Sequence, residues 1–194
     1  YTKNHNPKYA FIEAIQTFKD RNDLPAELFE LDILDGSPPC SSFSMSGNRE
    51  KDWGKQRKFS EGQSLQVLDT LFYDFIDLAE KLQPKVVVAE NVTGILKGNA
   101  RDYVRKVINA FDKAGYLVQE FELDSSQMNV PQKRERVFFI AIRKDLVELL
   151  PGPVGLLFSE FPKLDLKFGR SPIPFDEIRT EGLRDNSWTD HDQY

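Results

Sequence analysis

The most reactive side chain in the sequence is a single cysteine that directly follows two prolines, in Ser37-Pro38-Pro39-Cys40. A thiolate is the strong nucleophile among protein side chains once nearby dipoles or cations lower its pKa. Prolines restrict the backbone, so a rigid turn would present this cysteine. The pattern favours Cys40 as a nucleophile, and the alternative is an inert thiol buried as a small apolar group.

A carboxylate and an amide, Glu90 and Asn91, end the apolar run Val86-Val87-Val88-Ala89. Partial burial at a strand end raises the pKa of a carboxyl group and allows it to hold a proton. Glu90 is therefore a candidate general acid. The alternative is a glutamate that caps the turn after the strand.

A third polar cluster contains two arginines and a glutamine within Val130-Pro131-Gln132-Lys133-Arg134-Glu135-Arg136. Strand alternation predicts that Gln132, Arg134 and Arg136 share one side as a strand begins. Two like charges on one face indicate an anionic partner. A solvated basic edge is the alternative.

The elements that must position these residues alternate between short apolar runs and helical patterns, which predicts an α/β fold with a parallel sheet flanked by helices. A capping box at Ser60-Glu61-Gly62-Gln63 would begin one helix, and Gly115 would end another. The expected strands cover 31–34, 86–89, 116–123 and 137–142, and the expected helices cover 60–82 and 101–113.

The expected strand ends place the three clusters at one edge of the sheet. In open parallel sheets ligands bind at the carboxyl edge of the strands. We therefore expect Cys40, Glu90 and Arg134 to converge on one cleft.

The composition fits one globular domain, with 194 residues of which 40% are hydrophobic. No apolar run approaches the roughly 20 residues of a membrane helix, and Tyr1-Thr2-Lys3-Asn4-His5 does not have the charged-then-apolar pattern of a signal segment. The single cysteine excludes an internal disulfide and a cysteine-based zinc site, so we expect a reducing, cytoplasmic setting and no metal. A cysteine hydrolase would need a histidine base, but only His5 and His191 exist, at opposite ends.

The net charge of −5 argues mildly against nucleic-acid binding when it is averaged over the chain. The local distribution differs, because residues 49–58 contain five basic and two acidic side chains. This stretch belongs to a Ser- and Gly-rich loop, 41–62, that could contact DNA phosphates and carries Trp53. We expect residues 41–60 to be the most mobile part of the core, and a merely solvated flexible loop is the alternative.

Taken together, these motifs resemble those of the cytosine-5 DNA methyltransferase family over roughly residues 1–145. The motifs occur in the family's order and strand context. They are Pro38-Pro39-Cys40 with Phe43-Ser44, then Leu71-Phe72 leading to Pro84-Lys85, then Glu90-Asn91-Val92, and finally Gln132-x-Arg134-x-Arg136.

The resemblance implies a Rossmann-like methyltransferase fold and a DNA-methylating, restriction-modification type of enzyme. A methyl group would pass from S-adenosyl-L-methionine to carbon 5 of a cytosine flipped out of double-stranded DNA, through a covalent Cys40 adduct. The residues it implies are Cys40, Glu90 and Arg134 for catalysis, Ser41, Asn91, Gln132 and Arg136 for the substrate, and Asp20, Pro38 and Leu71 for the cofactor.

The sequence also departs from the family. The Phe-x-Gly-x-Gly motif that holds the methionine part of the cofactor is absent, as are the target-recognition region and the closing motifs. We therefore expect a catalytic domain truncated at both ends, with 1–150 as its core and 151–194 as a linker or the start of the recognition region. The chain alone should be inactive and bind cofactor weakly, and the alternative function is a non-catalytic or split-enzyme fragment that acts with a partner chain.

Overall fold

The computed structural model describes residues 2–39, 56–57, 66–67, 70–97, 100–147, 164–174 and 177. The predictions for Cys40, for Ser41 and for the loop 41–60 therefore fall outside the described residues, apart from its short pair at 56–57. The chain forms two compact units. The first comprises Tyr1–Glu122 with Arg136–Leu166, and the second comprises Leu123–Glu135 with Lys167–Tyr194.

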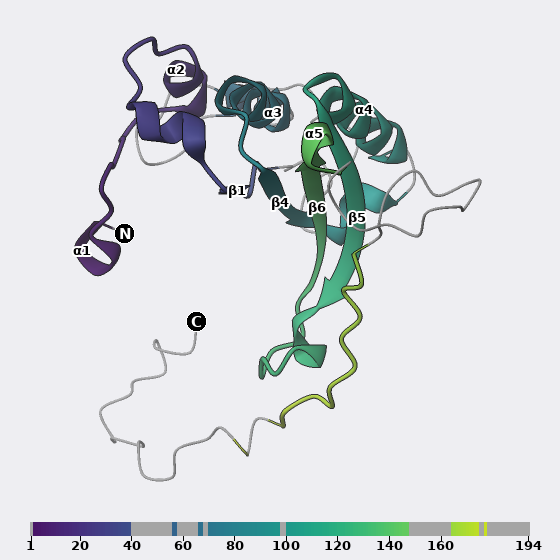
Figure 1. Ribbon diagram of the computed structural model, residues 1–194. Coiled ribbons are helices and arrows are strands. Elements are labelled where there is room, and N and C mark those ends of the chain that lie inside the picture. Colours follow the sequence, from purple (N-terminus) through teal and green to yellow (C-terminus); the bar gives the residue numbers. More distant parts are fainter. Residues whose placement is uncertain are drawn as a thin grey trace. The chain divides into compact units, whose positions relative to one another are not determined.

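A four-stranded sheet organises the described residues, and its strands lie in the order β1-β4-β6-β5 (Figure 1). The α/β prediction is confirmed. β1 runs parallel to β4, but β6 runs antiparallel to β4, so the sheet is mixed rather than mainly parallel. No crossover helix separates β5 from β6, so the chain returns in the opposite direction there. The strands are β1 (Ile33–Gly36), β4 (Val86–Val92), β5 (Tyr116–Asp124) and β6 (Glu135–Arg143).

Two amphipathic helices, α3 (Leu71–Leu82) and α4 (Ala100–Lys113), pack on one face of this sheet. The alternation of the strands sets that face: Val87 and Ala89 of β4 are fully buried, and so is Phe139 of β6. Phe72 of α3 lies at the centre of the core, where its ring meets Phe139 edge-on at 5.6 Å. The helical apolar spacing and the strand alternation thus meet in one core.

The bounds of several predicted elements are confirmed. The helix expected over 101–113 is α4, and Gly115 after it has a φ of +93°, a conformation that glycine adopts without steric cost. The strand expected over 116–123 is β5. β4 continues through Val92, so Glu90 and Asn91 lie inside the strand, and the first strand is Ile33–Gly36 instead of 31–34.

The helix predicted from Ser60 is wrong at its start, because α3 begins at Leu71. Gln66–Val67 instead forms the short strand β3, which pairs antiparallel with β2 (Gln56–Arg57). Helical spacing of apolar residues continues upstream of Leu71 in the sequence. That spacing does not prevent the backbone from pairing with another segment, since pairing satisfies the same donors and acceptors.

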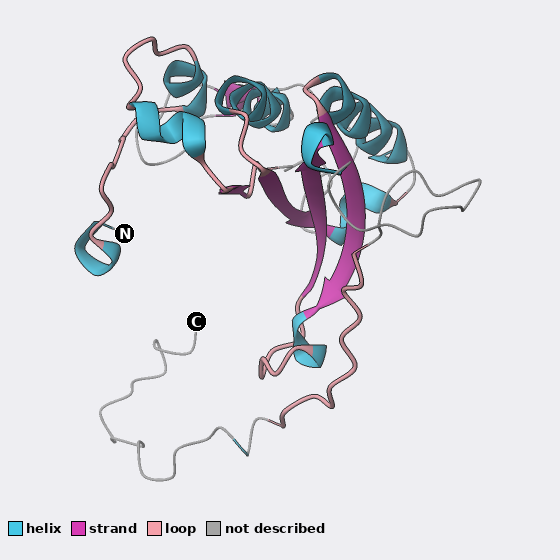
Figure 2. Ribbon diagram, in the orientation of Figure 1, coloured by secondary structure: helices cyan, strands magenta, loops and turns pink. Residues whose placement is uncertain are grey.

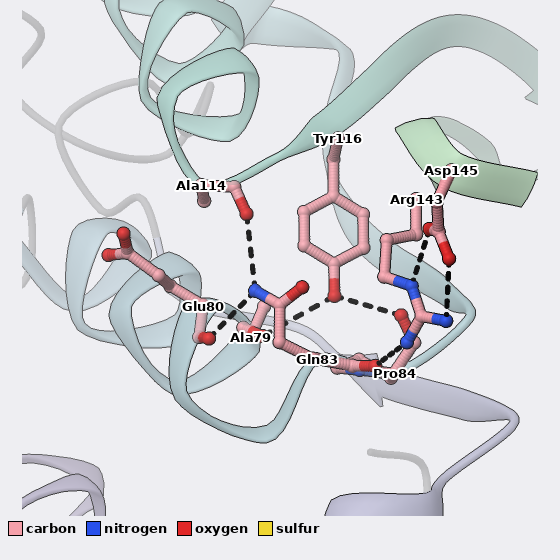
Figure 3. Close-up of polar contacts among 8 residues, drawn as sticks. All are labelled: Ala79, Glu80, Gln83, Pro84, Ala114, Tyr116, Arg143 and Asp145. Carbon is pink, nitrogen blue, oxygen red and sulfur yellow. Dashed lines mark hydrogen bonds and ion pairs between the residues drawn. The ribbon is translucent and has the colours of Figure 1, made fainter.

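The start of β4 is closed by hydrogen bonds from side chains to carbonyl groups (Figure 3). The hydroxyl of buried Tyr116 donates to the carbonyl of Pro84 at 2.8 Å. Arg143 donates to the carbonyl of Gln83, whose φ of +50° ends α3, and forms an ion pair with Asp145 at 2.7 Å. Burial raises the pKa of Tyr116 to about 12. This end of the sheet is therefore a closed structural corner.

The remaining elements are short (Figure 2). Lys81 of α3 donates to the carbonyl of Lys19, and Lys19 forms an ion pair with Asp74 at 2.8 Å, so α2 is fixed to α3. Among the described residues no helix is long and apolar enough to cross a membrane, and no group of three or more ligating side chains could hold a metal ion. The short elements are α1 (Thr2–His5), α2 (Ile15–Lys19), η1 (Ala26–Glu30), η4 (Thr93–Leu96), η5 (Ser125–Gln127) and α5 (Lys144–Val147).

Candidate active site

The segment that leads to Cys40 is tied to β4 by a buried amide. Parallel pairing places Gly36 of β1 opposite Ala89, so the chain leaves β1 beside the end of β4. Asn91, only 4% exposed, donates from Nδ2 to the carbonyl of Pro38 at 3.1 Å. Its Oδ1 accepts from the backbone N–H of Val92 at 2.9 Å. Both polar ends of the amide are therefore used, and the position of Pro38 is fixed two residues before Cys40.

Close packing of β1 against α3 depends on Gly36. A Cβ added at this position would lie 2.5 Å from Cε2 of Phe75, well inside any real carbon contact. The Phe75 ring is 4% exposed and therefore confined by the core. The absence of a side chain at Gly36 thus lets α3 approach the strand end where the site lies.

Glu90 and Arg136 form an ion pair on the other face of β4 from Asn91. The strand register pairs Glu90 with Phe138 and Val92 with Arg136, so Glu90 and Arg136 are diagonal neighbours on one face. The Arg136 Nε lies 2.8 Å from Oε1 of Glu90, and the two side chains are 23% and 24% exposed. Because side chains alternate along β4, Asn91 points to the core and binds Pro38, whereas Glu90 points to the open face and pairs with Arg136.

A cavity of about 310 Å³ lies at the end of β1, inside the first unit. Its walls include Pro38 and Leu71, two of the predicted cofactor residues, and Ile15 of α2. Asp35 and Ser37 add polar atoms to an otherwise apolar lining. Small-molecule sites have this composition, with apolar walls and few polar groups, and start at about 300 Å³.

The other predicted residues have different surroundings. Asp20 is the C-cap of α2 and does not line the cavity. Gln132 and Arg134 are exposed and belong to the second unit, whereas Arg136 belongs to the first. The three do not share one side of a strand, because β6 begins only at Glu135.

A turn, rather than a strand, precedes β6. The hydroxyl of Ser125 donates to the carbonyl of Gln132, and the backbone N–H of Ser125 donates to the carbonyl of Arg134 at 3.2 Å. These bonds fold the loop back on η5 and end the alternation that the sequence pattern predicted. The roles of Gln132 and Arg134 stay a prediction.

Sequence reasoning missed Ile15 and Asp35, which line the cavity. Ile15 is one apolar residue in a weakly periodic stretch, so no local signal marked it. Asp35 could have been noticed, because it is a charged residue at the end of the same strand that leads to Pro38. The partnership of Glu90 and Arg136 was also missed, since it depends on a register that joins residues far apart in the sequence.

The chain matches the model of the C-5 cytosine-specific DNA methylase family over residues 1–171. This match covers most of the chain, so the chain belongs to this family.

Individual relatives cover most of the chain. The Type II methyltransferase M.DdeI of Desulfomicrobium norvegicum is 33% identical over 175 residues, which are 87% of this chain and 39% of that protein. M.FnuDI of Fusobacterium nucleatum, also named a Type II methyltransferase, is 34% identical over 188 residues, or 97% of this chain and 44% of that protein. The chain therefore spans less than half the length of these relatives.

A solved structure supports the fold alone. It is an E. coli prophage protein described as a DNA modification methyltransferase, with a TM-score of 0.51 and 23% sequence identity. The similarity covers 84% of this chain and 38% of that one.

Proposed function

We propose that this chain carries the catalytic part of a DNA cytosine-5 methyltransferase, with Cys40 as its nucleophile. The observation that carries the proposal is the hydrogen bond from buried Asn91 to the carbonyl of Pro38. It ties the segment before the single cysteine to the strand that bears Glu90. A buried amide with both ends satisfied is a strong positional constraint.

Carbon 5 of cytosine is a poor nucleophile and must be activated. The Cys40 thiolate attacks carbon 6 and forms a sulfur–carbon bond, which moves electron density onto carbon 5 and toward ring nitrogen 3. With S-adenosyl-L-methionine bound, carbon 5 would take its methyl group, and the sulfur would leave as a neutral thioether. Loss of the carbon-5 proton returns the electron pair to the ring and expels the thiolate, so the nucleophile is regenerated.

Glu90 is the proposed acid for ring nitrogen 3, where negative charge develops. In the structure the ion pair with Arg136 holds the ionised carboxylate at a defined place beside the end of β4, so Glu90 must take up a proton from solvent before it can donate one to the ring. Arg136 can then contact a DNA phosphate, as charge-assisted hydrogen bonds from arginine commonly do. Arg134 is the proposed contact to the base, with Ser41 and Gln132 supporting the substrate.

The cavity at the end of β1 fits the apolar and aromatic part of S-adenosyl-L-methionine. Leu71, Ile15 and Pro38 offer apolar walls, and Asp35 and Ser37 offer oxygen atoms for polar groups. When bound, this cofactor supplies an electrophilic methyl group on a positively charged sulfur. Pro38 would connect the cofactor cavity to the segment before Cys40, because it lines that cavity and its carbonyl accepts a hydrogen bond from Asn91.

Double-stranded DNA is the proposed substrate. The target cytosine must leave the helix to react with a protein thiol, at a cost of a few kcal/mol of unstacking. Such unstacking is offset by contacts to the DNA backbone, which come from basic side chains.

Methyl transfer tests the proposal directly. The complete gene product is incubated with duplex DNA and S-adenosyl-L-methionine labelled on the methyl group, and 5-methylcytosine is measured in the DNA. We expect transfer by the native protein and none by Cys40→Ser. Transfer that survives Cys40→Ser, or none by the native protein, contradicts the proposal. The 194-residue chain assayed alone is expected to be inactive and to bind the cofactor more weakly than micromolar.

A further inference from the structure

The described residues of the second unit carry more positive than negative charge, in contrast to the net −5 of the chain. Its described carboxylates are Asp124, Glu135 and Glu177, against four cations. Two of the three have partners: Asp124 accepts from the backbone N–H of Ser126 at 3.0 Å, and Glu135 lies 3.5 Å from Lys133. Its basic side chains, all exposed, are Lys133, Arg134, Lys167 and Arg170.

Backbone hydrogen bonds join the two basic stretches. The N–H of Arg170 donates to the carbonyl of Gln127 at 3.2 Å, which attaches the segment 167–170 to η5. Ser125, at the other end of η5, binds the carbonyls of Gln132 and Arg134. Two stretches more than 30 residues apart in sequence are thus fixed to the same helical turn.

The segment 167–170 is open on one side. A Cβ added at Gly169 would meet no other atom within 4 Å, and Phe168 is 40% exposed. Neither Lys167 nor Arg170 makes an ion pair with any residue of the described ranges. Two cations that flank an uncovered glycine can therefore approach a ligand without first breaking contacts.

We infer that Lys167 and Arg170 bind the phosphate backbone of the DNA and form a phosphate-binding surface next to Gln132 and Arg134. This inference rests on the proposed function, because DNA is the polyanion that the proposed reaction brings to the protein. A duplex carries about one negative charge per 1.7 Å of its axis, which matches a cluster of cations better than a single anionic ligand does. The surface positions the duplex without reading its sequence.

Salt dependence of binding tests this role. Each phosphate contact contributes about 0.9 to the slope of log affinity against log salt, so the double variant Lys167→Ala/Arg170→Ala should lower the slope by about 1.8. The complete gene product is titrated with a cytosine-containing duplex at several salt concentrations. Lys106→Ala/Lys113→Ala is the matched control, since it removes two exposed cations from α4 in the first unit, and its slope should stay close to that of the native protein.

A second pair of variants tests the surface without removing a cation. Gly169→Glu places a negative charge between Lys167 and Arg170 in open space, whereas Gly169→Gln adds nearly the same volume without charge. We expect at least about tenfold weaker duplex binding for Gly169→Glu and little change for Gly169→Gln.

The outcomes separate this inference from the proposed function. Equal salt slopes for the native protein and Lys167→Ala/Arg170→Ala overturn the phosphate-binding surface, even where methyl transfer proceeds normally. Absence of duplex DNA binding, or binding of duplex RNA in its place, overturns it too. If the native protein transfers no methyl group but its salt slope still differs from that of Lys167→Ala/Arg170→Ala, only the proposed function is overturned.

Discussion

At both ends of β4, side chains donate hydrogen bonds to backbone carbonyl groups, but only one end has a cavity beside it. At its start, Tyr116 and Arg143 donate to carbonyl groups of the turn that leads into the strand, and the corner is closed. At its far end, Asn91 donates to the carbonyl of Pro38, but a cavity and the ion pair of Glu90 with Arg136 lie beside it. Both arginines come from β6, one from each end, because β6 runs antiparallel to β4.

This difference predicts at which end of β4 a substitution leaves methyl transfer unchanged. Side-chain bonds to carbonyls stabilise a turn in either place. Only the far end combines them with a partly exposed acid, a cavity and the segment before a cysteine. We therefore expect substitutions at the start of β4 to affect stability alone, and substitutions at its far end to affect methyl transfer more than stability.

The largest effect is expected from Glu90→Gln. Loss of the acid should lower turnover by about 10²–10⁴-fold. The free energy of unfolding should change by less than about 1 kcal/mol, because the ion pair is partly exposed. Labelled-methyl transfer and urea unfolding of the complete gene product measure the two quantities. A loss of stability as large as the loss of activity would remove the distinction between the two ends.

Asn91→Ala should affect both properties. It leaves the buried carbonyl of Pro38 and the N–H of Val92 without their partner, at a cost of about 1–3 kcal/mol. Turnover should fall further than the unfolded fraction explains, since the segment before Cys40 is no longer fixed. Asn91→Asp is the informative control: it keeps an acceptor for Val92 but loses the donor to Pro38. Full activity in Asn91→Asp would show that the bond to Pro38 does not position the nucleophile.

Gly36→Ala tests the packing that supports the site. The added methyl group collides with the Phe75 ring and should destabilise the protein by about 1–3 kcal/mol. Combining it with Phe75→Leu should recover part of that loss, because the smaller side chain makes room for the methyl group. Thermal unfolding of the single and double variants measures the coupling, and strictly additive effects would contradict the proposed contact.

The smallest effect is expected at the closed corner. Tyr116→Phe removes the hydroxyl bond to Pro84 and should cost about 0.5–1.5 kcal/mol, with turnover unchanged. The pKa of Tyr116 is raised to about 12 by burial, so the unfolded chain ionises first as the pH rises. Its contribution to stability is complete below about pH 10, the usual tyrosine value, and is lost by about pH 12.

Unfolding of native and Tyr116→Phe protein across that pH range measures the difference. The native protein should lose stability more steeply than the variant between pH 10 and 12. Parallel curves would mean that the buried hydroxyl does not couple to folding.

The sequence predicted much of the fold where a pattern is long and local. The periodicity of 101–113 and the apolar run at 86–89 gave α4 and the body of β4. The predicted start of α3 was wrong, because the capping-box pattern at Ser60 depends on only four residues. The direction of β6 was missed, although the expected strands 116–123 and 137–142 have no helical pattern between them that could form a crossover.

In the candidate site, too, the sequence predicted what a local motif marks and missed the contacts between residues distant in sequence. Pro38 and Leu71, chosen by their resemblance to a motif, do line one cavity, whereas Asp20 does not. The link from Asn91 to Pro38 and the pairing of Glu90 with Arg136 join residues more than 40 positions apart. Such contacts depend on sheet register, which no local pattern encodes.

We propose above all that Cys40 is the nucleophile and that the bond from Asn91 to Pro38 fixes the segment before it. A duplex in which the target cytosine carries fluorine at carbon 5 tests it, because no carbon-5 proton is then available for elimination and the adduct persists. With cofactor present, mass spectrometry of the complete gene product should find the methylated base attached to the peptide that contains Cys40. Asn91→Ala should form much less of this adduct, and Cys40→Ser none. An adduct on another residue, or equal yields from native protein and Asn91→Ala, would contradict the account.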